Sequence, residues 1–243
     1  GTFAAMPGFA SCNPQERSPL VDLVDQPLHT ILEGTGHRSP DLGGSTASIL
    51  AALIGLSLIR MAVEVSLGNE GGSEAATDEL EQALATLDRQ SVALTDLADA
   101  DQEAFQAYLA VLKRRRQPQA SEGGRDAAVS VEQARSRDDA VSSAETVATR
   151  MPVQAAHVIV QALELVEATA NRIKSTVVSD IFGGAALLHG ALTGVLLAVD
   201  INLKSGQPQS HAALAADRDH LSWRGKDAFA EIKMRAEAAS YQL

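Results

Sequence analysis

Residues 181–199 read IFGGAALLHGALTGVLLAV, and this stretch decides the fold because it contains no formally charged side chain. A second apolar run, ASILAALIGLSLI, occupies residues 47–59 and stops at Arg60. Neither run has the Trp, Tyr and asymmetric Lys and Arg that anchor a membrane-spanning helix. Both carry Gly, Ala and Ser, which let helices approach closely. We therefore expect two central buried helices, with membrane spans as the alternative.

The composition of the whole chain favours helices over strands. Hydrophobic residues make up 45% of the 243 residues but aromatic residues only 3%. The core must then be filled by Ala, Leu, Val and Ile, and Ala and Leu are strong helix formers. We predict an all-α fold, an up-and-down helical bundle with two central Gly/Ala-rich helices, whose core is either its own or shared with a second copy of the chain. Residues 20–243 are expected to form one domain, preceded by a flexible leader over 1–19.

The spacing of apolar residues sets the expected helix boundaries. Helices are predicted at 20–33, 47–67, 74–116, 137–151, 152–174, 177–203 and from 209 to the end of the chain. Pro152 is expected to close one helix and to occupy the first turn of the next. Residues 117–136 contain Pro118 and a Gly123-Gly124 pair, and are predicted to be a surface loop or an insertion.

Charge and cysteine content exclude several classes of function. The net charge of −11 argues against a nucleic-acid partner, and the basic run Arg114-Arg115-Arg116 is too short to reverse it. Cys12 is the only cysteine, so no intrachain disulfide forms and a reducing, cytoplasmic location is expected. The sequence also shows no recognisable secretory signal.

The usual catalytic signatures are missing from the sequence. There is no Walker loop, dinucleotide fingerprint, His-Glu-x-x-His motif, paired CxxC or nucleophile elbow. The six histidines show no metal-ligand spacing, so no metal site is expected.

One candidate site is the turn Gly43-Gly44-Ser45 at the entrance of an apolar helix. Unpaired N–H groups and the positive end of the helix dipole accept a carboxylate, a phosphate or a ring oxygen. The alternative is a tight turn in which Ser45 is an ordinary N-cap.

Carboxylates form the second group of candidates. Ser179-Asp180 begins the most apolar helix, where Asp180 is either a cap or a site carboxylate able to hold a proton. Asp101 lies on the 74–116 helix among acids that we expect to be solvated. Asp200 and Asn202 end the helix that Asp180 begins, so they serve a different end of the molecule or the site of a partner.

Two other groups have simple structural explanations. His189 is expected to be a neutral core histidine. Arg60 and Glu64, one turn apart, form either a buried ion pair or a solvent-facing edge.

Four segments together resemble the formiminotransferase-cyclodeaminase and methenyltetrahydrofolate cyclohydrolase family. The matching segments are Asp41-Leu42-Gly43-Gly44-Ser45 with Val65-Ser66-Leu67-Gly68, the element Asp101-Gln102-Glu103-Ala104-Phe105-Gln106-Ala107-Tyr108, the stretch from Arg137 to Met151-Pro152, and the helix from Ser179-Asp180 to Ile201-Asn202-Leu203. The resemblance covers most of residues 28–204.

The chain departs from the family pattern at polar positions. The first glycine of the family turn is Leu42, and the family's Asn near the end of that helix is Glu64. Leu-Pro-Lys is replaced by residues 114–116, and Gly-Asn-x-Asn by residues 173–176.

The resemblance implies hydrolysis or cyclisation at a formimino or methenyl carbon bridging N5 and N10 of a reduced folate. No metal and no cofactor beyond the tetrahydrofolate-type substrate is implied. The implied roles are acid or base for Asp180, a supporting carboxylate for Asp101, and substrate contacts for the remaining candidates, which are Gly43, Gly44, Ser45, Ser179, Lys113 and Lys174. The implied partners are a reduced folate or related pterin and a second copy of the chain. The alternative function is a non-catalytic helical dimer that has lost the folate site.

Overall fold

The computed structural model describes residues 22–38, 41–67, 74–116, 127–205, 208–241 and 243. All regular elements in these ranges are helices, which confirms the predicted all-α class. The α-helices are α1 Leu28–Gly36, α2 Gly44–Leu67, α3 Glu74–Arg116, α4 Ala127–Thr169, α5 Val178–Ser205 and α6 Pro208–Ala238. Short 3-10 turns lie at η1 Leu23–Asp25, η2 Ala170–Arg172 and η3 Ser175–Val177.

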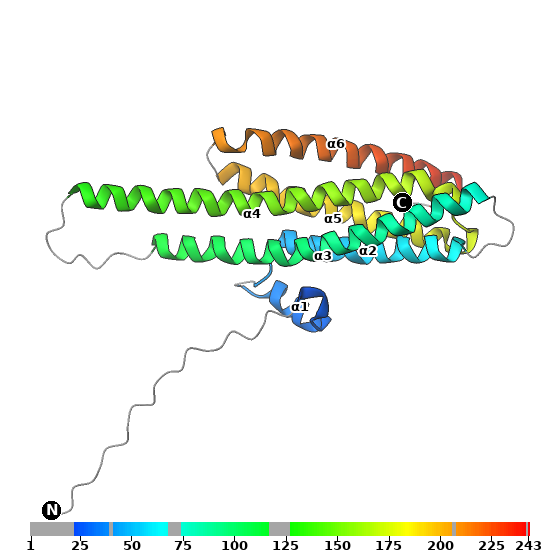
Figure 1. The fold of residues 1–243 in the computed structure, drawn as a ribbon, viewed down its shortest axis with the longest axis horizontal. Coiled ribbons are helices and arrows are strands. Elements are labelled where there is room, and N and C mark those ends of the chain that lie inside the picture. The colour runs from blue at the N-terminus through cyan, green and yellow to red at the C-terminus, as the bar shows by residue number, and fades with distance from the viewer. Residues whose placement is uncertain (1–21, 39–40, 68–73, 117–126, 206–207, 242) are drawn as a thin grey trace, which may run out of the picture.

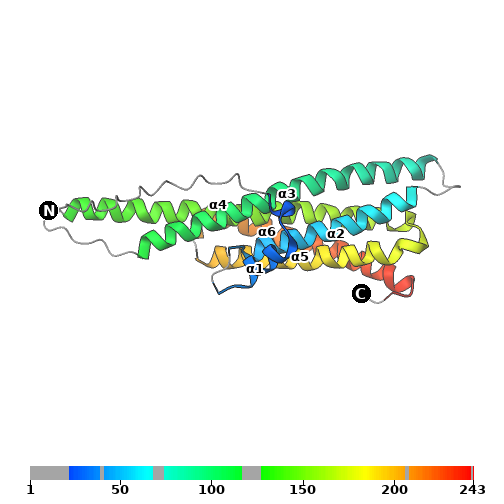
Figure 2. The ribbon, with the colours of Figure 1, turned by 90° about the horizontal axis from the view of Figure 1, so that it is seen from below.

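Helices α2, α3, α4 and α5 form an up-and-down bundle in which consecutive helices run in opposite directions (Figure 1). Helix α2 packs on α3 and α5, and α4 completes the ring by packing on the same two helices. Helix α6 lies against α4 and α5. The long helices α3 and α4 extend beyond the amino end of α2 (Figure 2). The site described below lies where α2 begins beside them.

Helices α2 and α5 pack closely against each other, and glycines make their approach possible. A Cβ atom on Gly55 would lie 2.8 Å from the carbonyl oxygen of Gly184, and one on Gly184 would lie 2.7 Å from that of Gly55. Side-chain atoms do not fit at such distances, so these positions let the two backbones meet. Ile49, Leu56, Ile181 and Leu188 are fully buried around this crossing.

Only one side of α2 and of α5 is buried. Both helices are long and apolar enough to cross a membrane by length and composition, and 44% and 50% of their most apolar windows are buried inside the bundle. The predicted burial of these two helices is therefore found only on the side of each that faces α3, α4 and α6. The opposite side is uncovered and includes Ile54, 57% exposed, and Leu197, 56% exposed.

The predicted helix over 20–33 is wrong at its start. The chain forms the turn η1, becomes extended at Gln26, and begins α1 only after Pro27. Proline lacks an N–H donor and restricts the residue before it to extended conformations, so a helix begins after Pro27 instead of running through it. The leader over 1–19, including Cys12, lies outside the described residues.

The prediction of a helix break at Pro152 is also wrong. Helix α4 runs from Ala127 to Thr169 with Pro152 inside it, so the predicted loop over 117–136 is helical from residue 127 onward. The next helix was expected to reach Lys174, but α4 ends at Thr169 and two short turns follow. Proline removes one helical hydrogen bond. The carbonyl group left without that bond belongs to Ala148 and accepts a hydrogen bond in the site described below.

The glycine crossing generates a test of the core. We expect Gly55→Val to lower the free energy of unfolding by about 1–3 kcal/mol, because the added atoms collide with backbone and cannot be relieved by a side-chain rotation. Ala85→Val, on an exposed position of α3, is the matched control and should cost no more than about 0.7 kcal/mol in helix propensity. Urea unfolding followed by circular dichroism measures both. Equal effects of the two substitutions would contradict a tight crossing.

Candidate functional site

A cavity of about 150 Å³ lies where α2 begins, beside the middle of α3 and the carboxyl end of α5. It is lined by Gly43, Gly44, Ser45, Asp101, Phe105, Tyr108, Ala148, Ala198, Ile201 and Asn202. These residues come from four helices and from the turn before α2. The structure thus brings together the predicted turn, Asp101 and the carboxyl end of α5.

Asp101 is the charged group of this cavity. Its side chain is only 2% exposed, and its Oδ2 atom accepts hydrogen bonds from Ser45 Oγ at 2.7 Å and from Thr46 Oγ1 at 2.6 Å. Burial raises the pKa of Asp101, while these two hydrogen bonds act in the opposite direction. A carboxyl group with a raised pKa is able to hold a proton and to transfer it.

The turn before α2 packs against residues of α1 and α3. Gly43 lies against Phe105, since a Cβ atom at Gly43 would be 3.5 Å from that ring. Leu42, which replaces a glycine of the family pattern, is buried and packs near Gly34 instead of lining the cavity. Its backbone φ is not positive, so the position does not need glycine. The substitution at Leu42 therefore leaves the cavity open.

Pro152 helps to hold a polar wall of the cavity. In a regular helix the N–H group of residue 152 would bond to the carbonyl group of Ala148, but proline has no N–H group. Asn202 at the end of α5 instead donates its Nδ2–H to the Ala148 oxygen at 3.3 Å. The proline inside α4 thus leaves the Ala148 carbonyl group as an acceptor for the Asn202 amide. This hydrogen bond fixes the position of the Asn202 side chain at the cavity.

Aromatic and aliphatic side chains form the remaining wall. Phe105 and Tyr108 follow Asp101 at intervals of four and three residues, so all three lie on one face of α3. Ile201 lines the cavity while 67% of its surface is exposed, which places it at the rim. Flat apolar rings beside a carboxyl group and an amide suit a planar heterocyclic ligand.

Ser179, Asp180 and Lys174, which were also predicted as site residues, lie at the opposite end of the bundle. Ser179 and Asp180 begin α5, whereas the cavity lies near Asn202, about 33 Å further along the helix at 1.5 Å per residue. Lys174 is near the carboxyl end of α2, where its backbone N–H donates to Ser66 Oγ at 3.0 Å. Within one chain, Asp180 and Asp101 therefore do not share a site.

Lys113 lies on the same helix as the cavity wall. It is exposed on α3, five residues beyond Tyr108, or about 8 Å along the helix. Its ammonium group is free to meet an anionic part of a ligand that extends out of the cavity.

His189 does not contribute to the cavity. Its ring stacks on that of Phe229 in α6, with 4.1 Å between ring centroids. Burial lowers the pKa of His189, and the nearby charge of Lys226 lowers it further. The prediction of a neutral histidine is consistent with this direction, and the ring serves the packing of α5 on α6.

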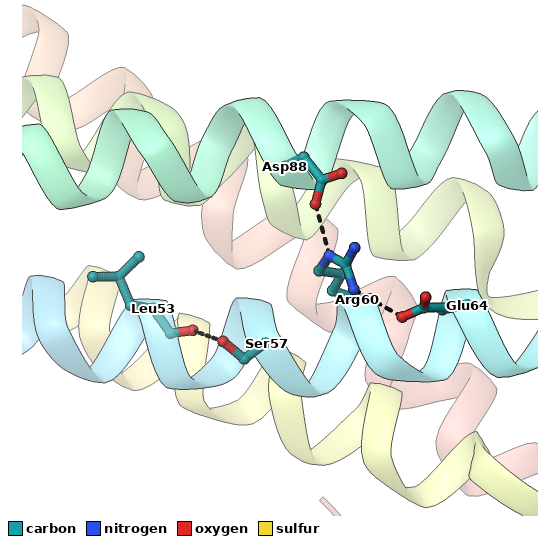
Figure 3. Close-up of polar contacts among 5 residues, drawn as sticks. All are labelled: Leu53, Ser57, Arg60, Glu64 and Asp88. Carbon is teal, nitrogen blue, oxygen red and sulfur yellow. Dashed lines mark hydrogen bonds and ion pairs between the residues drawn. The ribbon is translucent and has the colours of Figure 1, made fainter. Parts of the chain in front are cut away.

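Arg60 and Glu64 form a solvent-facing edge rather than a buried pair. Arg60 Nε donates to Asp88 Oδ1 at 2.6 Å and its guanidinium group contacts Glu64 Oε2 at 2.8 Å, which joins α2 to α3 (Figure 3). All three side chains are 38–59% exposed. Glu64, a departure from the family pattern, thus belongs to a surface network away from the cavity.

Sequence reasoning missed several residues of the cavity. Phe105 and Tyr108 were named only within the segment that resembles the family and were not proposed as site residues, although their spacing from Asp101 places all three on one face. Thr46 was not considered, although it directly follows the turn. Asp200 and Asn202 were expected to serve a different end of the molecule from Asp180 or the site of a partner, and Asn202 does lie at the opposite end of α5 from Asp180. Ile201 was not singled out. No cluster of three His, Cys, Asp or Glu side chains that could hold a metal ion occurs among the described residues.

Comparisons with known proteins agree with the fold. The family model described as formiminotransferase-cyclodeaminase matches residues 27–218. The crystal structure of formiminotetrahydrofolate cyclodeaminase from Thermotoga maritima superposes with a TM-score of 0.74 at 18% sequence identity, covering 90% of this chain and 100% of that chain. No curated protein matches the chain.

Asp101 generates a test of stability against pH. Its raised folded-state pKa means that the folded protein binds this proton more tightly than the unfolded chain does. The contribution of Asp101 to stability must therefore fall as pH rises from 3.8 through its folded pKa, and then level off. Asp101→Asn lacks this dependence, so wild-type stability minus variant stability should fall across that window, by about 1.4 kcal/mol for each unit of pKa shift.

The measurement is urea unfolding of both proteins at a series of pH values. Asp96→Asn, on an exposed position of the same helix, controls for the loss of a surface charge. A wild-type minus variant difference that rises with pH would show that Asp101 is stabilised in its charged form, contrary to the effect of burial.

Pro152 generates a second test. In Pro152→Ala the new N–H group competes with Asn202 for the Ala148 oxygen. We expect the helix to gain stability, by up to about 3 kcal/mol, while Asn202 becomes more mobile. The side-chain amide resonances of Asn202 in NMR spectra report on this, with Asn171, exposed beyond the end of α4, as the internal reference. Unchanged Asn202 resonances would contradict the role given to Pro152.

Proposed function

Because the chain belongs to the formiminotransferase-cyclodeaminase family, we propose that it is an enzyme of one-carbon folate metabolism that acts on formimino- or methenyl-tetrahydrofolate. The reaction is either cyclodeamination or hydrolysis at the carbon that bridges N5 and N10. Family membership supports the substrate class, and the cavity at the start of α2 supports a site for it.

The observation that carries the proposal is the buried carboxyl group of Asp101 in a cavity with aromatic walls. In cyclodeamination N10 attacks the formimino carbon, and the resulting tetrahedral aminal loses ammonia. The amino group must gain a proton as its bond to carbon breaks, and N10 must lose one. The carboxyl group of Asp101, whose pKa is raised by burial, is the group that exchanges these protons in the proposed reaction.

The remaining cavity residues take binding roles in this proposal. Phe105 and Tyr108 stack against the flat pterin ring. The N–H groups at the start of α2 and the amide of Asn202 meet its polar edge. Lys113 attracts the carboxylates of the glutamate tail. No metal or further cofactor enters the proposed reaction.

The cellular setting follows the sequence. We propose a cytoplasmic homodimer, in which Ser179, Asp180 and Lys174 contribute to the site of a second copy. Within one chain these residues lie too far from Asp101 to contribute to the same cavity.

The direct test is turnover. Purified protein is mixed with 5-formiminotetrahydrofolate or with 5,10-methenyltetrahydrofolate, and the methenyl absorbance is followed. We expect turnover by the wild type and a fall of about 10²–10⁴-fold in kcat for Asp101→Asn, with Asp96→Asn retaining wild-type activity.

Three outcomes would change the proposal. Full activity of Asp101→Asn would remove this carboxyl group from the mechanism. Binding of the folate without turnover would leave a binding protein. Failure of the folded protein to bind any reduced folate would favour the non-catalytic helical dimer.

A further inference from the structure

We propose that Thr46 is a positioning residue for Asp101, because its hydroxyl group and that of Ser45 together occupy Oδ2 of the carboxyl group and leave Oδ1 to exchange a proton with the ligand. That the ligand is a reduced folate rests on the proposed function. The choice between the two oxygen atoms rests on the hydrogen bonds and on the burial of Thr46.

Ser45 and Thr46 donate to an unusual acceptor for hydroxyl groups on a helix. Further along α2, Ser48 Oγ donates at 2.7 Å to the carbonyl oxygen four residues earlier. Ser57 Oγ bonds in the same way to the carbonyl oxygen of Leu53 (Figure 3). Such bonds to the preceding turn are common for serine and threonine inside helices. The hydroxyl groups of Ser45 and Thr46 instead reach another helix.

The position of the two residues in the first turn of α2 explains this difference. The helix begins only one residue before Ser45, so the carbonyl groups four residues before Ser45 and Thr46 precede the helix and lack helical geometry. One of them, the carbonyl oxygen of Asp41, accepts a hydrogen bond from Gln106 Nε2 at 2.5 Å. Helix α3 passes beside this turn and places Asp101 within reach of both hydroxyl groups.

Both hydroxyl groups bind the same oxygen atom of Asp101. Ser45 Oγ lies 2.7 Å and Thr46 Oγ1 lies 2.6 Å from Oδ2. Each oxygen of a carboxyl group offers two lone pairs, so both acceptor positions of Oδ2 are occupied. No described residue donates a hydrogen bond to Oδ1. A proton that binds to Asp101 is therefore carried by Oδ1.

Oδ1 is also the oxygen atom that a ligand can reach. Asp101 lines the cavity, and its Oδ1 atom is not among the described polar atoms that are fully covered and lack a partner. It therefore keeps contact with the open space of the cavity. Thr46 is fully buried and does not line the cavity. Its hydroxyl group acts on a ligand only through Asp101.

Thr46 is better suited than Ser45 to hold the carboxyl group in place. The two heavy atoms on the Cβ atom of threonine restrict the rotation of its side chain, and the side chain of Thr46 is enclosed on all sides. Ser45 lines the cavity, so its hydroxyl group is exposed to competing acceptors on a ligand. The hydrogen bond from Thr46 is therefore the one that persists when the cavity is filled.

Hydroxyl groups, and not charged side chains, oppose the effect of burial on Asp101. Burial raises the pKa of Asp101, and the hydrogen bonds from Thr46 and Ser45 lower it. The charged groups on the surrounding elements are Asp41 before α2, Asp99 and Glu103 on α3, Glu145 on α4, and Asp200 with its partner Arg218 on α5. None of them is among the causes of the pKa shift of Asp101.

Direct titration of Asp101 tests the role of Thr46. The carboxyl carbon of Asp101 is followed by NMR in ligand-free protein that contains carbon-13 aspartate, and its signal is assigned with Asp101→Asn. Thr46→Val keeps the shape of the side chain but removes the donor, so the titration midpoint should move to higher pH by roughly 1–2 pH units. Thr46→Ser keeps the hydroxyl group and should titrate like the wild type.

Thr169→Val is the matched control. Thr169 is 7% exposed at the end of α4, and its hydroxyl group donates to the carbonyl oxygen of Leu165 at 2.7 Å. The same substitution there removes a buried hydroxyl group that does not contact Asp101, and the midpoint should not move. Thr46→Ala is a second variant without the donor, which avoids crowding by valine, and it should move the midpoint in the same direction as Thr46→Val.

The pH dependence of turnover tests the link to the reaction. In Thr46→Val the limb of the kcat/KM profile that reports on Asp101 should move to higher pH by the same amount as the NMR midpoint. The plateau of kcat should fall by up to about 10²-fold, because the carboxyl group is no longer held in one orientation. KM should stay close to that of the wild type, since Thr46 does not line the cavity. Ser45→Ala, by contrast, should also raise KM.

The outcomes separate the two proposals. A wild type without turnover of reduced folates would contradict the proposed function, while the NMR titration would still decide the role of Thr46. An unchanged midpoint in Thr46→Val and Thr46→Ala, or an equal change in Thr169→Val, would overturn the positioning role. A midpoint that moves in Thr46→Val without any change in the pH profile of turnover would overturn proton exchange at Oδ1.

Discussion

The contact between α2 and α5 at Gly55 and Gly184 is the constraint on which the other features depend. Because the two backbones meet there, α2 and α5 are held in a fixed antiparallel register. That register sets Ser45 and Thr46 at the start of α2 next to the carboxyl end of α5. It also determines which sides of the two helices remain uncovered. The core crossing and the cavity are therefore consequences of one packing arrangement.

The cavity combines local irregularities that would destabilise an ordinary bundle. A carboxyl group is buried at Asp101, at the cost of its hydration, and accepts hydrogen bonds from two hydroxyl groups. A proline interrupts the hydrogen bonds of α4, and the acceptor that it frees holds Asn202. Both irregularities occur at the same end of the bundle. This concentration of unfavourable local features in one place is typical of a functional site.

Sequence patterns predicted α2, α3 and α5 closely, because long apolar periodicity and clear terminating residues specify such helices. They failed at Pro27 and Pro152 for opposite reasons. Pro27 was overlooked inside a helical pattern and is in fact its boundary, whereas Pro152 was taken as a boundary and is tolerated inside α4. Sequence rules for single helices do not show which carbonyl groups will accept a hydrogen bond from another helix, as the Ala148 carbonyl does from Asn202. The family resemblance placed the turn, Asp101 and Asp180 in one site, and within one chain the length of α5 separates Asp180 from the other two.

The continuous α5 helix, which joins the glycine crossing near one end to the cavity wall at the other, restricts how this sequence can change in evolution. Substitutions along it alter one contact at a time. Insertion of a single residue between Gly184 and Ala198 would rotate everything beyond it by about 100° and turn Asn202 away from the cavity. Divergence in this fold should therefore proceed by replacement and not by change of length inside the helix.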